Sequence, residues 1–160
     1  KHSSLIDKVI VDGASPQPIK GYLKIIAIVY LMSFLKNTKF VANLLTKMMQ
    51  KDGAPVQDVQ RFVTDFQSAE RRSFRRAMSQ ANLLRLNLQF DNPAFFVSGG
   101  KEAEAIHDWH RRLAHKNARS ECAYYPGKGH AWLFSDVDTH IQLLGYFFQD
   151  VAFPEKLKRF

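Results

Sequence analysis

Short apolar runs separated by long helical patterns organise this chain. Three short strand-like runs occupy residues 7–12, 94–98 and 121–125, and each is followed by glycine or by proline and glycine. Continuous runs of this length are typical of strands buried on both faces of a parallel sheet. We therefore predict three strands at these positions.

The stretch between the first two runs has helical periodicity. Residues 19–50 have a helical composition, and residues 51–55 interrupt it with glycine and proline. Apolar positions at three- and four-residue steps then predict a helix over 56–66, with one face formed by Val56, Val59, Phe62, Val63 and Phe66. A helix over 68–84 would turn its arginines outward and four apolar residues inward: Phe74, Met78, Ala81 and Leu84.

Two further helical patterns cover residues 102–115 and 137–151. The second has one apolar stripe, formed by Ile141, Leu144, Phe147 and Phe148. The resulting order is strand, helical insertion, strand, helix, strand, helix, which implies an α/β fold with parallel strands covered by helices. We divide the chain accordingly at 1–18, 19–84 and 85–160.

Composition and charge limit the class of protein. At 160 residues, 46% apolar and 24% charged, the chain has the size and composition of one folded domain. The net charge of +8 raises nucleic-acid binding as an alternative. Much of the excess lies at 71–76 and 156–159, where a solvated helix face or tail can carry it. The first segment contains four arginines: Arg71, Arg72, Arg75 and Arg76. No recognised DNA- or RNA-binding motif surrounds them, so we expect no nucleic-acid partner.

Cysteine content and hydropathy argue against a disulfide-stabilised protein and a membrane-spanning protein. Cys122 is the single cysteine, which excludes an internal disulfide, and it lies in an apolar run as a small buried hydrophobe would. The apolar stretch at 22–35 is interrupted by Lys24 and closed by Lys36, so it is too short to span a bilayer. Because it is internal and has no small-residue cleavage site after it, it is not a secretory signal. We expect a cytoplasmic protein without membrane contact.

A glycine-rich segment after the third predicted strand carries candidate chemistry. Residues 125–132 read Tyr-Pro-Gly-Lys-Gly-His-Ala-Trp, so a bend flanked by glycines places His130 just past a strand end. Histidine can take and give a proton near neutral pH because its ordinary pKa is about 6.5. A general base fits this position better than a packing residue. The alternative is a structural histidine that closes a turn.

This segment and the Phe-Phe-Val-Ser-Gly-Gly-Lys-Glu segment at 95–102 resemble the C-terminal part of an α/β-hydrolase. In that family, successive strands lead into a helical lid, a loop with the catalytic acid and a loop with the catalytic histidine. The resemblance implies three parallel strands of a hydrolase core at 1–18 and 85–160, with a helical lid at 19–84. It covers essentially the whole chain, but only the C-terminal part of the family's pattern.

The resemblance also implies two catalytic residues. His130 matches the base, and Glu102 matches the acid that orients it, where the family most often has aspartate. A carboxylate on the second ring nitrogen holds one tautomer and stabilises the imidazolium. The alternative for Glu102 is a structural role, in which its negative charge is stabilised by the dipole at the N-terminus of the following helix. Glu104 is a poorer match because it would point elsewhere, and Asp136 and Asp138 remain alternative acids.

The other five histidines do not indicate a metal site. His107 and His110 are three residues apart on a predicted helix, but no carboxylate–histidine constellation joins them to form a zinc or iron site. The remaining three are predicted to lie at the surface: His2, His115 and His140. We expect neither a metal nor a cofactor.

The serine nucleophile that such a histidine would activate is not recognisable. The family holds it in a Gly-x-Ser-x-Gly turn between a strand and a helix, and no such pentapeptide occurs here. Ser15 and Ser98 lie near glycines, but neither begins a helix directly from a strand. The chain also begins with Lys1 instead of Met. We expect a piece of a longer polypeptide whose N-terminal part carries the nucleophile and oxyanion hole, although a cloned or processed start would look the same.

Three functions therefore compete. The first is the lid-and-histidine part of a serine hydrolase acting on an ester, thioester or similar acyl substrate, active only within the full-length protein. Its partners would be the acyl substrate and either the N-terminal hydrolase part or a second copy. The second is a non-catalytic partner-binding fragment or degenerate hydrolase, and the third is a nucleic-acid-binding helical domain. Aromatic residues of the insertion would suit a lid over an apolar group, or simply pack between helices: Phe34, Phe40, Phe62, Phe66 and Phe74.

Overall fold

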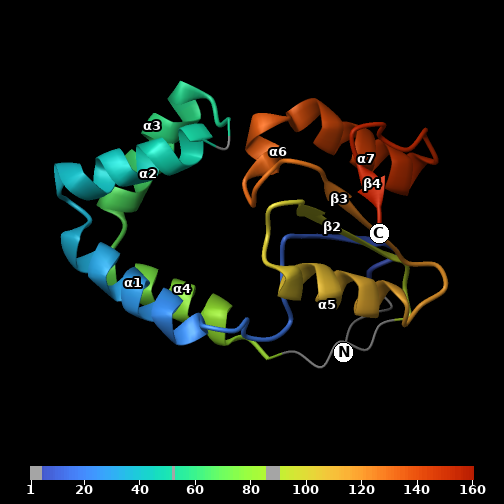
Figure 1. Cartoon of the computed structure of the whole chain (residues 1–160), viewed down its shortest axis with the longest axis horizontal. Helices are drawn as coiled ribbons and strands as arrows, with labels where there is room; N and C mark the ends of the chain where they lie inside the picture. Colours follow the sequence, from blue (N-terminus) through green and yellow to red (C-terminus); the bar gives the residue numbers. More distant parts are fainter. Residues whose placement is uncertain (1–4, 52, 86–90) are drawn as a thin grey trace. The chain divides into compact units, whose positions relative to one another are not determined.

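The chain folds into two compact units (Figure 1). A computed structural model describes residues 5–51, 53–85 and 91–160. Residues 1–16 and 87–160 form the first unit, here called the sheet unit. Residues 17–86 form the second, here called the helical unit.

The sheet unit is built on three adjacent parallel strands. β1 (Val9–Asp12) pairs with β2 (Ala94–Gly99), and β2 pairs with β3 (Glu121–Tyr125), both in parallel. Ile10 lies opposite Phe95, and Phe95 opposite Glu121. The predicted positions, adjacency and direction of the three strands are therefore confirmed.

A fourth strand makes the sheet mixed, which corrects the expectation of a purely parallel sheet. β4 (Lys158–Arg159) runs antiparallel to β3, with Lys158 opposite Tyr124. A turn between Pro154 and Leu157 reverses the chain just before it, with a hydrogen bond from the Leu157 N–H to the Pro154 carbonyl. The two residues of β4 are charged and exposed, so no apolar pattern marks this strand in the sequence.

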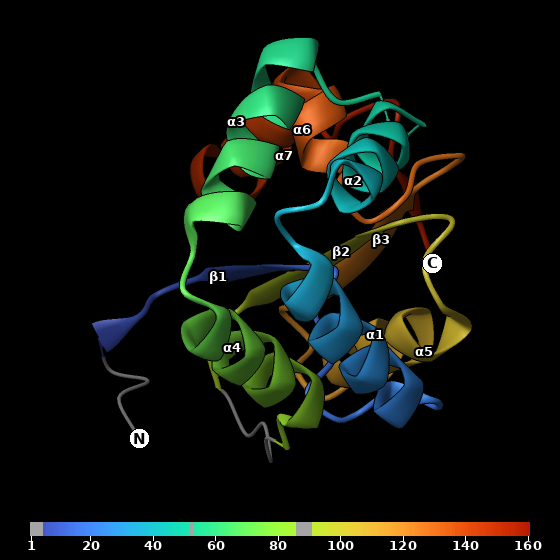
Figure 2. The ribbon, with the colours of Figure 1, turned by 90° about the vertical axis from the view of Figure 1, so that its left-hand side faces the viewer.

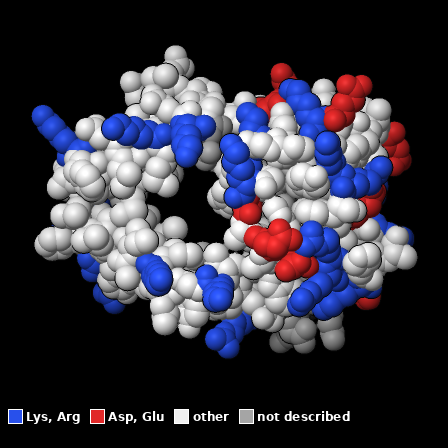
Figure 3. All heavy atoms as spheres, viewed as in Figure 1, with Lys and Arg blue, Asp and Glu red and all other residues white. Residues whose placement is uncertain are grey.

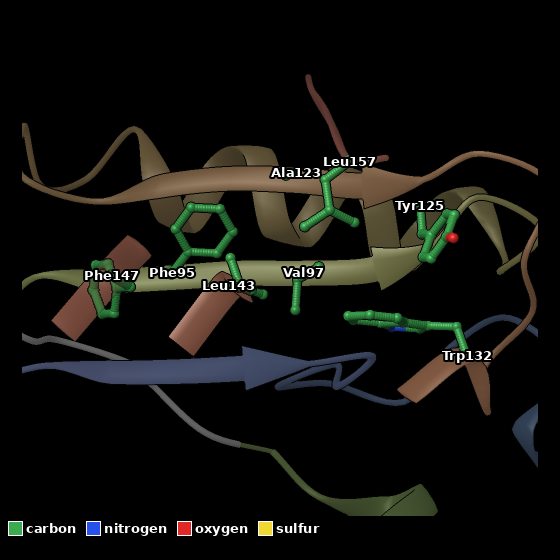
Figure 4. Close-up of a cluster of buried hydrophobic side chains, with 8 residues drawn as sticks. All are labelled: Phe95, Val97, Ala123, Tyr125, Trp132, Leu143, Phe147 and Leu157. Atoms are coloured by element: carbon green, nitrogen blue, oxygen red, sulfur yellow. The ribbon is translucent and has the colours of Figure 1, made fainter. Parts of the chain in front are cut away.

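Helices cover both faces of the sheet. Because successive strand residues point to opposite faces, β2, which is buried along its whole length, supplies both layers of the core. Ala94 and Phe96 pack with Leu113 of α5 (Glu104–Ala114) on one face. On the other face, the core includes Phe95, Val97, Ala123, Tyr125, Trp132, Leu143, Phe147 and Leu157 (Figure 4). Trp132 belongs to α6 (Trp132–Ser135), a short helix that the sequence pattern does not predict.

The last helix buries a different stripe from the predicted one. α7 (Val137–Gln149) begins at Asp136, whose carboxylate accepts a hydrogen bond from the Thr139 N–H and caps the helix. It buries Thr139, Leu143 and Phe147, at four-residue steps. Of the predicted stripe only Phe147 is buried, and the other three members are exposed: Ile141, Leu144 and Phe148.

The helical unit consists of two packed helix pairs (Figure 2). α1 (Tyr22–Leu35) packs against α4 (Arg71–Leu83), and α2 (Lys39–Lys51) packs against α3 (Val56–Ser68). Val41, Leu45 and Phe66 form its buried core. The break between α1 and α2 falls at Lys36, which is 6% exposed and whose ammonium group donates hydrogen bonds to the carbonyls of Gln67 and Ala69.

The outer helix of this unit contradicts its predicted inward face. α4 has no buried residue. Phe74 is half-buried against Phe66, with ring centroids 4.9 Å apart, whereas Met78, Ala81 and Leu84 are exposed. α4 packs mainly on α1, so a single neighbour covers only part of its apolar side. In α3, likewise, Val59 and Phe66 are buried while Val56 and Phe62 are exposed.

None of the helices within the described residues combines the length and apolar character that crossing a membrane requires.

Candidate active site

Two loops at one edge of the sheet are joined by their backbones. In the loop after β2, the Gly100 N–H donates to the Tyr125 carbonyl at the end of β3, at 2.8 Å, and the Lys101 N–H donates to the Lys128 carbonyl in the loop after β3, at 2.9 Å. At Gly99, an added Cβ would lie 2.2 Å from the Gly129 carbonyl oxygen, so only glycine allows this approach. The loops of the two neighbouring strands therefore form one rigid rim.

Glu102 and His130 meet on this rim. The Glu102 Oε2 lies 3.1 Å from the His130 Nδ1, within hydrogen-bond distance. The Glu102 side chain is 3% exposed and its Oε1 accepts a hydrogen bond from the Gly99 N–H at 3.0 Å, whereas the His130 side chain is 75% exposed. A buried, fixed carboxylate thus orients an imidazole that is open to solvent.

The environment keeps the carboxylate of this pair ionised. Burial opposes ionisation of Glu102, but the hydrogen bond and charge of the His130 ring outweigh it, together with the Gly99 N–H bond. The pKa of Glu102 is therefore below its ordinary value. An ionised carboxylate at Nδ1 holds the ring in the tautomer that leaves Nε2 as the proton acceptor.

The loop after β1 completes the rim with a glycine and an acid that sequence reasoning missed. Gly13 has a φ of 56°, and a Cβ there would lie 2.7 Å from the His130 Nδ1, so its backbone lies directly against the pair. Beside it, the Asp12 Oδ1 accepts a hydrogen bond from the Trp132 Nε1 at 3.1 Å. The sequence pattern that could have indicated this site is the Asp12-Gly13 pair at the end of the strand, but the same pair is equally typical of a simple turn.

Asp12 has an unusual charge state for a carboxyl group. Burial raises its pKa to about 6, and the nearby Glu102 carboxylate adds to this, while the Trp132 hydrogen bond and His130 act in the opposite direction. Its Oδ2 is buried and has no hydrogen-bond partner among the described residues. Near pH 6, the rim therefore carries one ionised carboxylate, Glu102, and a second carboxyl group close to its titration midpoint, Asp12.

The alternative acids are held elsewhere. Glu104 forms an ion pair with Arg111 at 2.6 Å. Asp136 accepts hydrogen bonds from the Tyr125 hydroxyl and the Lys156 ammonium group, both at 2.7 Å. Of the acids considered from the sequence, Glu102 is the one that the structure places on the imidazole of His130.

Three of the remaining histidines, His107, His110 and His140, pack within the fold. His107 and His110 are buried, and their Nε2 atoms lie 3.1 Å from the backbone oxygens of Gly99 and Ala14 respectively. His140 is half-buried against Trp132, which corrects its predicted surface position, and burial lowers its pKa. His115 is exposed as predicted, and His2 lies outside the described residues. Within those residues, no three His, Cys, Asp or Glu side chains are grouped as metal ligands.

Comparisons with known proteins give a fold but no sequence family. No protein-family model matches the chain, and no curated protein sequence matches it. Two solved structures are similar. MenH from S. aureus superposes with a TM-score of 0.68 at 15% identity, over 91% of this chain. Rv0554 from Mycobacterium tuberculosis superposes with a TM-score of 0.67 at 10% identity, over 94% of this chain.

Both similar structures have the α/β-hydrolase fold. In each case the match covers 59% of the other protein, so this chain spans well under two thirds of their length. At such low identity the likeness concerns the fold and not the chemistry. The chain therefore has the fold of a part of an α/β-hydrolase, with its mixed sheet and helical insertion.

Proposed function

We propose that this chain is the C-terminal part of a serine hydrolase of the α/β-hydrolase fold, which acts on an ester, thioester or similar acyl substrate. The observation that carries the proposal is the contact between Glu102 and His130 at 3.1 Å, on the loops that follow two neighbouring parallel strands. The carboxyl ends of such strands are where open α/β sheets place their sites.

In this proposal His130 is the general base and Glu102 the residue that orients it. The His130 Nε2 takes the proton of a serine hydroxyl as that oxygen attacks the acyl carbon, and then gives it to the leaving group. Glu102 holds Nδ1 protonated and stabilises the imidazolium formed between these two transfers. The ionised state of Glu102 supports this role.

The nucleophile would come from a partner. The sequence contains no Gly-x-Ser-x-Gly pentapeptide, and Ser98 is fully buried within β2. An N-terminal hydrolase part, or a second copy of this chain, would bring the serine and oxyanion hole to the rim. It would also pair with β1, which is the outermost strand on its side of the described sheet. Unpaired strand edges recruit other chains, so we expect association at micromolar concentration, and a monodisperse monomer would count against the proposal.

Joining the chain to the polypeptide encoded directly upstream tests the catalytic roles. We expect this longer protein to contain a Gly-x-Ser-x-Gly turn and to hydrolyse p-nitrophenyl esters. His130→Ala should lower kcat by at least about 10³-fold, because the members of such a triad act as a unit. His115→Ala, which changes an exposed histidine, is the matched control. Unchanged hydrolysis in His130→Ala would overturn the assignment.

The chain by itself provides a second test. We expect it to hydrolyse p-nitrophenyl acetate no faster than background, because an oriented base without its nucleophile retains little catalysis. Turnover lost in His130→Ala would contradict this and point to a serine within the chain. Ser15→Ala would then test the residue that lies two positions after Gly13, whose backbone contacts the site.

A non-catalytic role is the second candidate. The absence of the nucleophile pentapeptide from the sequence favours a partner-binding fragment or a degenerate hydrolase. An upstream polypeptide without Gly-x-Ser-x-Gly, together with stable binding of that polypeptide to this chain, would support this alternative over the first.

A further inference from the structure

The whole net charge of the protein belongs to the helical unit. Residues 17–86 contain 12 Lys and Arg against 4 Asp and Glu, whereas the sheet unit contains 11 of each. On the face drawn in Figure 3, Lys and Arg lie over both units, whereas Asp and Glu gather over the sheet unit. The four arginines of α4 account for half of the net charge of +8.

These arginines line a groove within the helical unit. The groove has a volume of about 1090 Å³, and its charged lining consists of five cations and one acid: Lys36, Arg71, Arg72, Arg75, Arg76 and Glu70. The carboxylate of Glu70 accepts a hydrogen bond from the Ser73 hydroxyl at 2.8 Å. Within the described residues, no carboxylate forms an ion pair with any of the four arginines.

This arrangement opposes the stability of the helix that carries it. Arg71 and Arg75 are four residues apart, as are Arg72 and Arg76, so each pair places like charges on neighbouring turns. Like charges at this spacing destabilise a helix. An anion bound between them would remove the repulsion, so the groove is electrostatically suited to a negatively charged ligand.

One of the four guanidinium groups is already held in place. The Arg75 Nε donates a hydrogen bond to the Ser33 hydroxyl at 2.8 Å, and Ser33 is fully buried. The Arg75 guanidinium also lies over the Tyr30 ring, 5.1 Å from its centroid. A bond through Nε fixes the plane of the group and directs its terminal amino groups to other acceptors. A merely solvated arginine needs no such support.

We propose that this groove binds a small organic dianion whose charge lies on phosphate or carboxylate oxygens. The planar fork of arginine matches pairs of phosphate or carboxylate oxygens. The volume exceeds that of a single phosphate group, so an organic part would lie beside Tyr30 and Leu83, which also line the groove. The site lies entirely within the helical unit and does not depend on the roles proposed for Glu102 and His130.

Titration of the full chain with model anions tests this proposal. Phenyl phosphate, succinate and inorganic phosphate, each at fixed ionic strength and followed by NMR or calorimetry, distinguish a phosphate ester, a dicarboxylate and a free ion. Phenol is the neutral control. We expect saturable binding of phenyl phosphate or succinate and none of phenol. Arg75→Gln should weaken binding about tenfold or more, as loss of a hydrogen bond to a charged group does.

Two further variants separate a built site from general positive charge. Arg61→Gln removes one positive charge from α3 outside the groove and should leave binding nearly unchanged. Ser33→Ala keeps every charge but releases Arg75, and it should weaken binding severalfold. Circular dichroism would first establish that each variant is folded.

Two results would overturn the proposal. One is equal binding by the Arg75→Gln, Ser33→Ala and Arg61→Gln variants, which would indicate a solvated basic surface only. The other is a single-stranded oligonucleotide that binds far more tightly than phenyl phosphate, with a salt dependence equivalent to several phosphates. That outcome would assign the arginines to nucleic-acid binding.

Discussion

The two units of this chain differ in the balance between their positive and negative residues. In the sheet unit, positive and negative residues are equal in number, and three of the cations form ion pairs with carboxylates: Arg111, Lys156 and Arg159. The basic C-terminal segment 156–159 is therefore balanced by its own unit. In the helical unit, cations outnumber acids threefold, and the arginines of α4 pair with no carboxylate in the described residues. Net charge alone conceals this contrast.

The two candidate sites are also held by different means. The rim with Glu102 and His130 depends on backbone hydrogen bonds between loops and on close contacts at Gly99 and Gly13. The arginine groove depends on side-chain bonds, chiefly that of Arg75 to Ser33. A site built from backbone should tolerate salt and fail on small steric changes. A site built from unpaired charges should tolerate steric changes and weaken with salt.

The largest effect is expected from Gly99→Ala, which tests the backbone contact. The new Cβ would lie 2.2 Å from the Gly129 carbonyl oxygen, so one of the two loops has to move. We expect a loss of about 3 kcal/mol or more in the free energy of unfolding, measured in urea. Gly145→Ala in α7 is the control, because its Cβ would have ordinary contacts and should be neutral or stabilising. Equal stability of the two variants would contradict the rigid-rim description.

A smaller effect confined to the helical unit is expected from Lys36→Met. This change leaves the Gln67 and Ala69 carbonyls without their buried donor, at a cost of about 2 kcal/mol. Both tryptophans, Trp109 and Trp132, lie in the sheet unit. Urea unfolding followed by circular dichroism should therefore shift more than unfolding followed by tryptophan fluorescence. Identical shifts of both signals would show that the units unfold as one.

Asp12→Asn should change how the stability of the sheet unit depends on pH. The folded-state pKa of Asp12, about 6, exceeds its ordinary value of 3.8. Its contribution to stability is therefore fully present below pH 4 and is lost as the pH rises through 6. The variant has no carboxyl group at this position and lacks this loss. As the pH rises from 4 to 7, its free energy of unfolding should therefore increase by about 1–2 kcal/mol relative to that of wild type. Tryptophan fluorescence in urea measures the difference, and parallel pH profiles would refute it.

The smallest effect is expected from His130→Ala on the pKa of the Glu102 carboxyl group. His130→Ala removes the hydrogen bond and charge that lower the pKa of Glu102, while burial, which raises it, remains. The pKa of Glu102 should rise, as followed by carbon NMR of its carboxyl group. The stability that an ionised Glu102 contributes would then be lost at a higher pH as the solution is acidified. His115→Ala should leave the titration unchanged, and a fall in the variant's pKa would contradict the pairing.

Local pattern was sufficient for the framework of the sheet unit and for one pair of residues. Short, mostly apolar runs specified β1, β2 and β3, and the run is most continuous in β2, which is buried along its whole length. Their order with intervening helices specified parallel pairing. Parallel strands end at the same edge, so Glu102 and His130 could be placed together although 28 residues separate them. The catalytic roles of these two residues remain a prediction.

Only the tertiary structure decided which neighbours each element has. Periodicity shows that a helix has an apolar face, but not whether another element covers it. Met78 of α4 and Leu84, the residue after α4, are therefore exposed where burial was predicted. The two-residue β4 exists because a turn brings it beside β3. The contact of Asp12 with Trp132 joins residues 120 positions apart, and no local signal encodes it. Sequence determines what each segment can bury or donate, whereas contacts between distant segments determine what it does bury or donate.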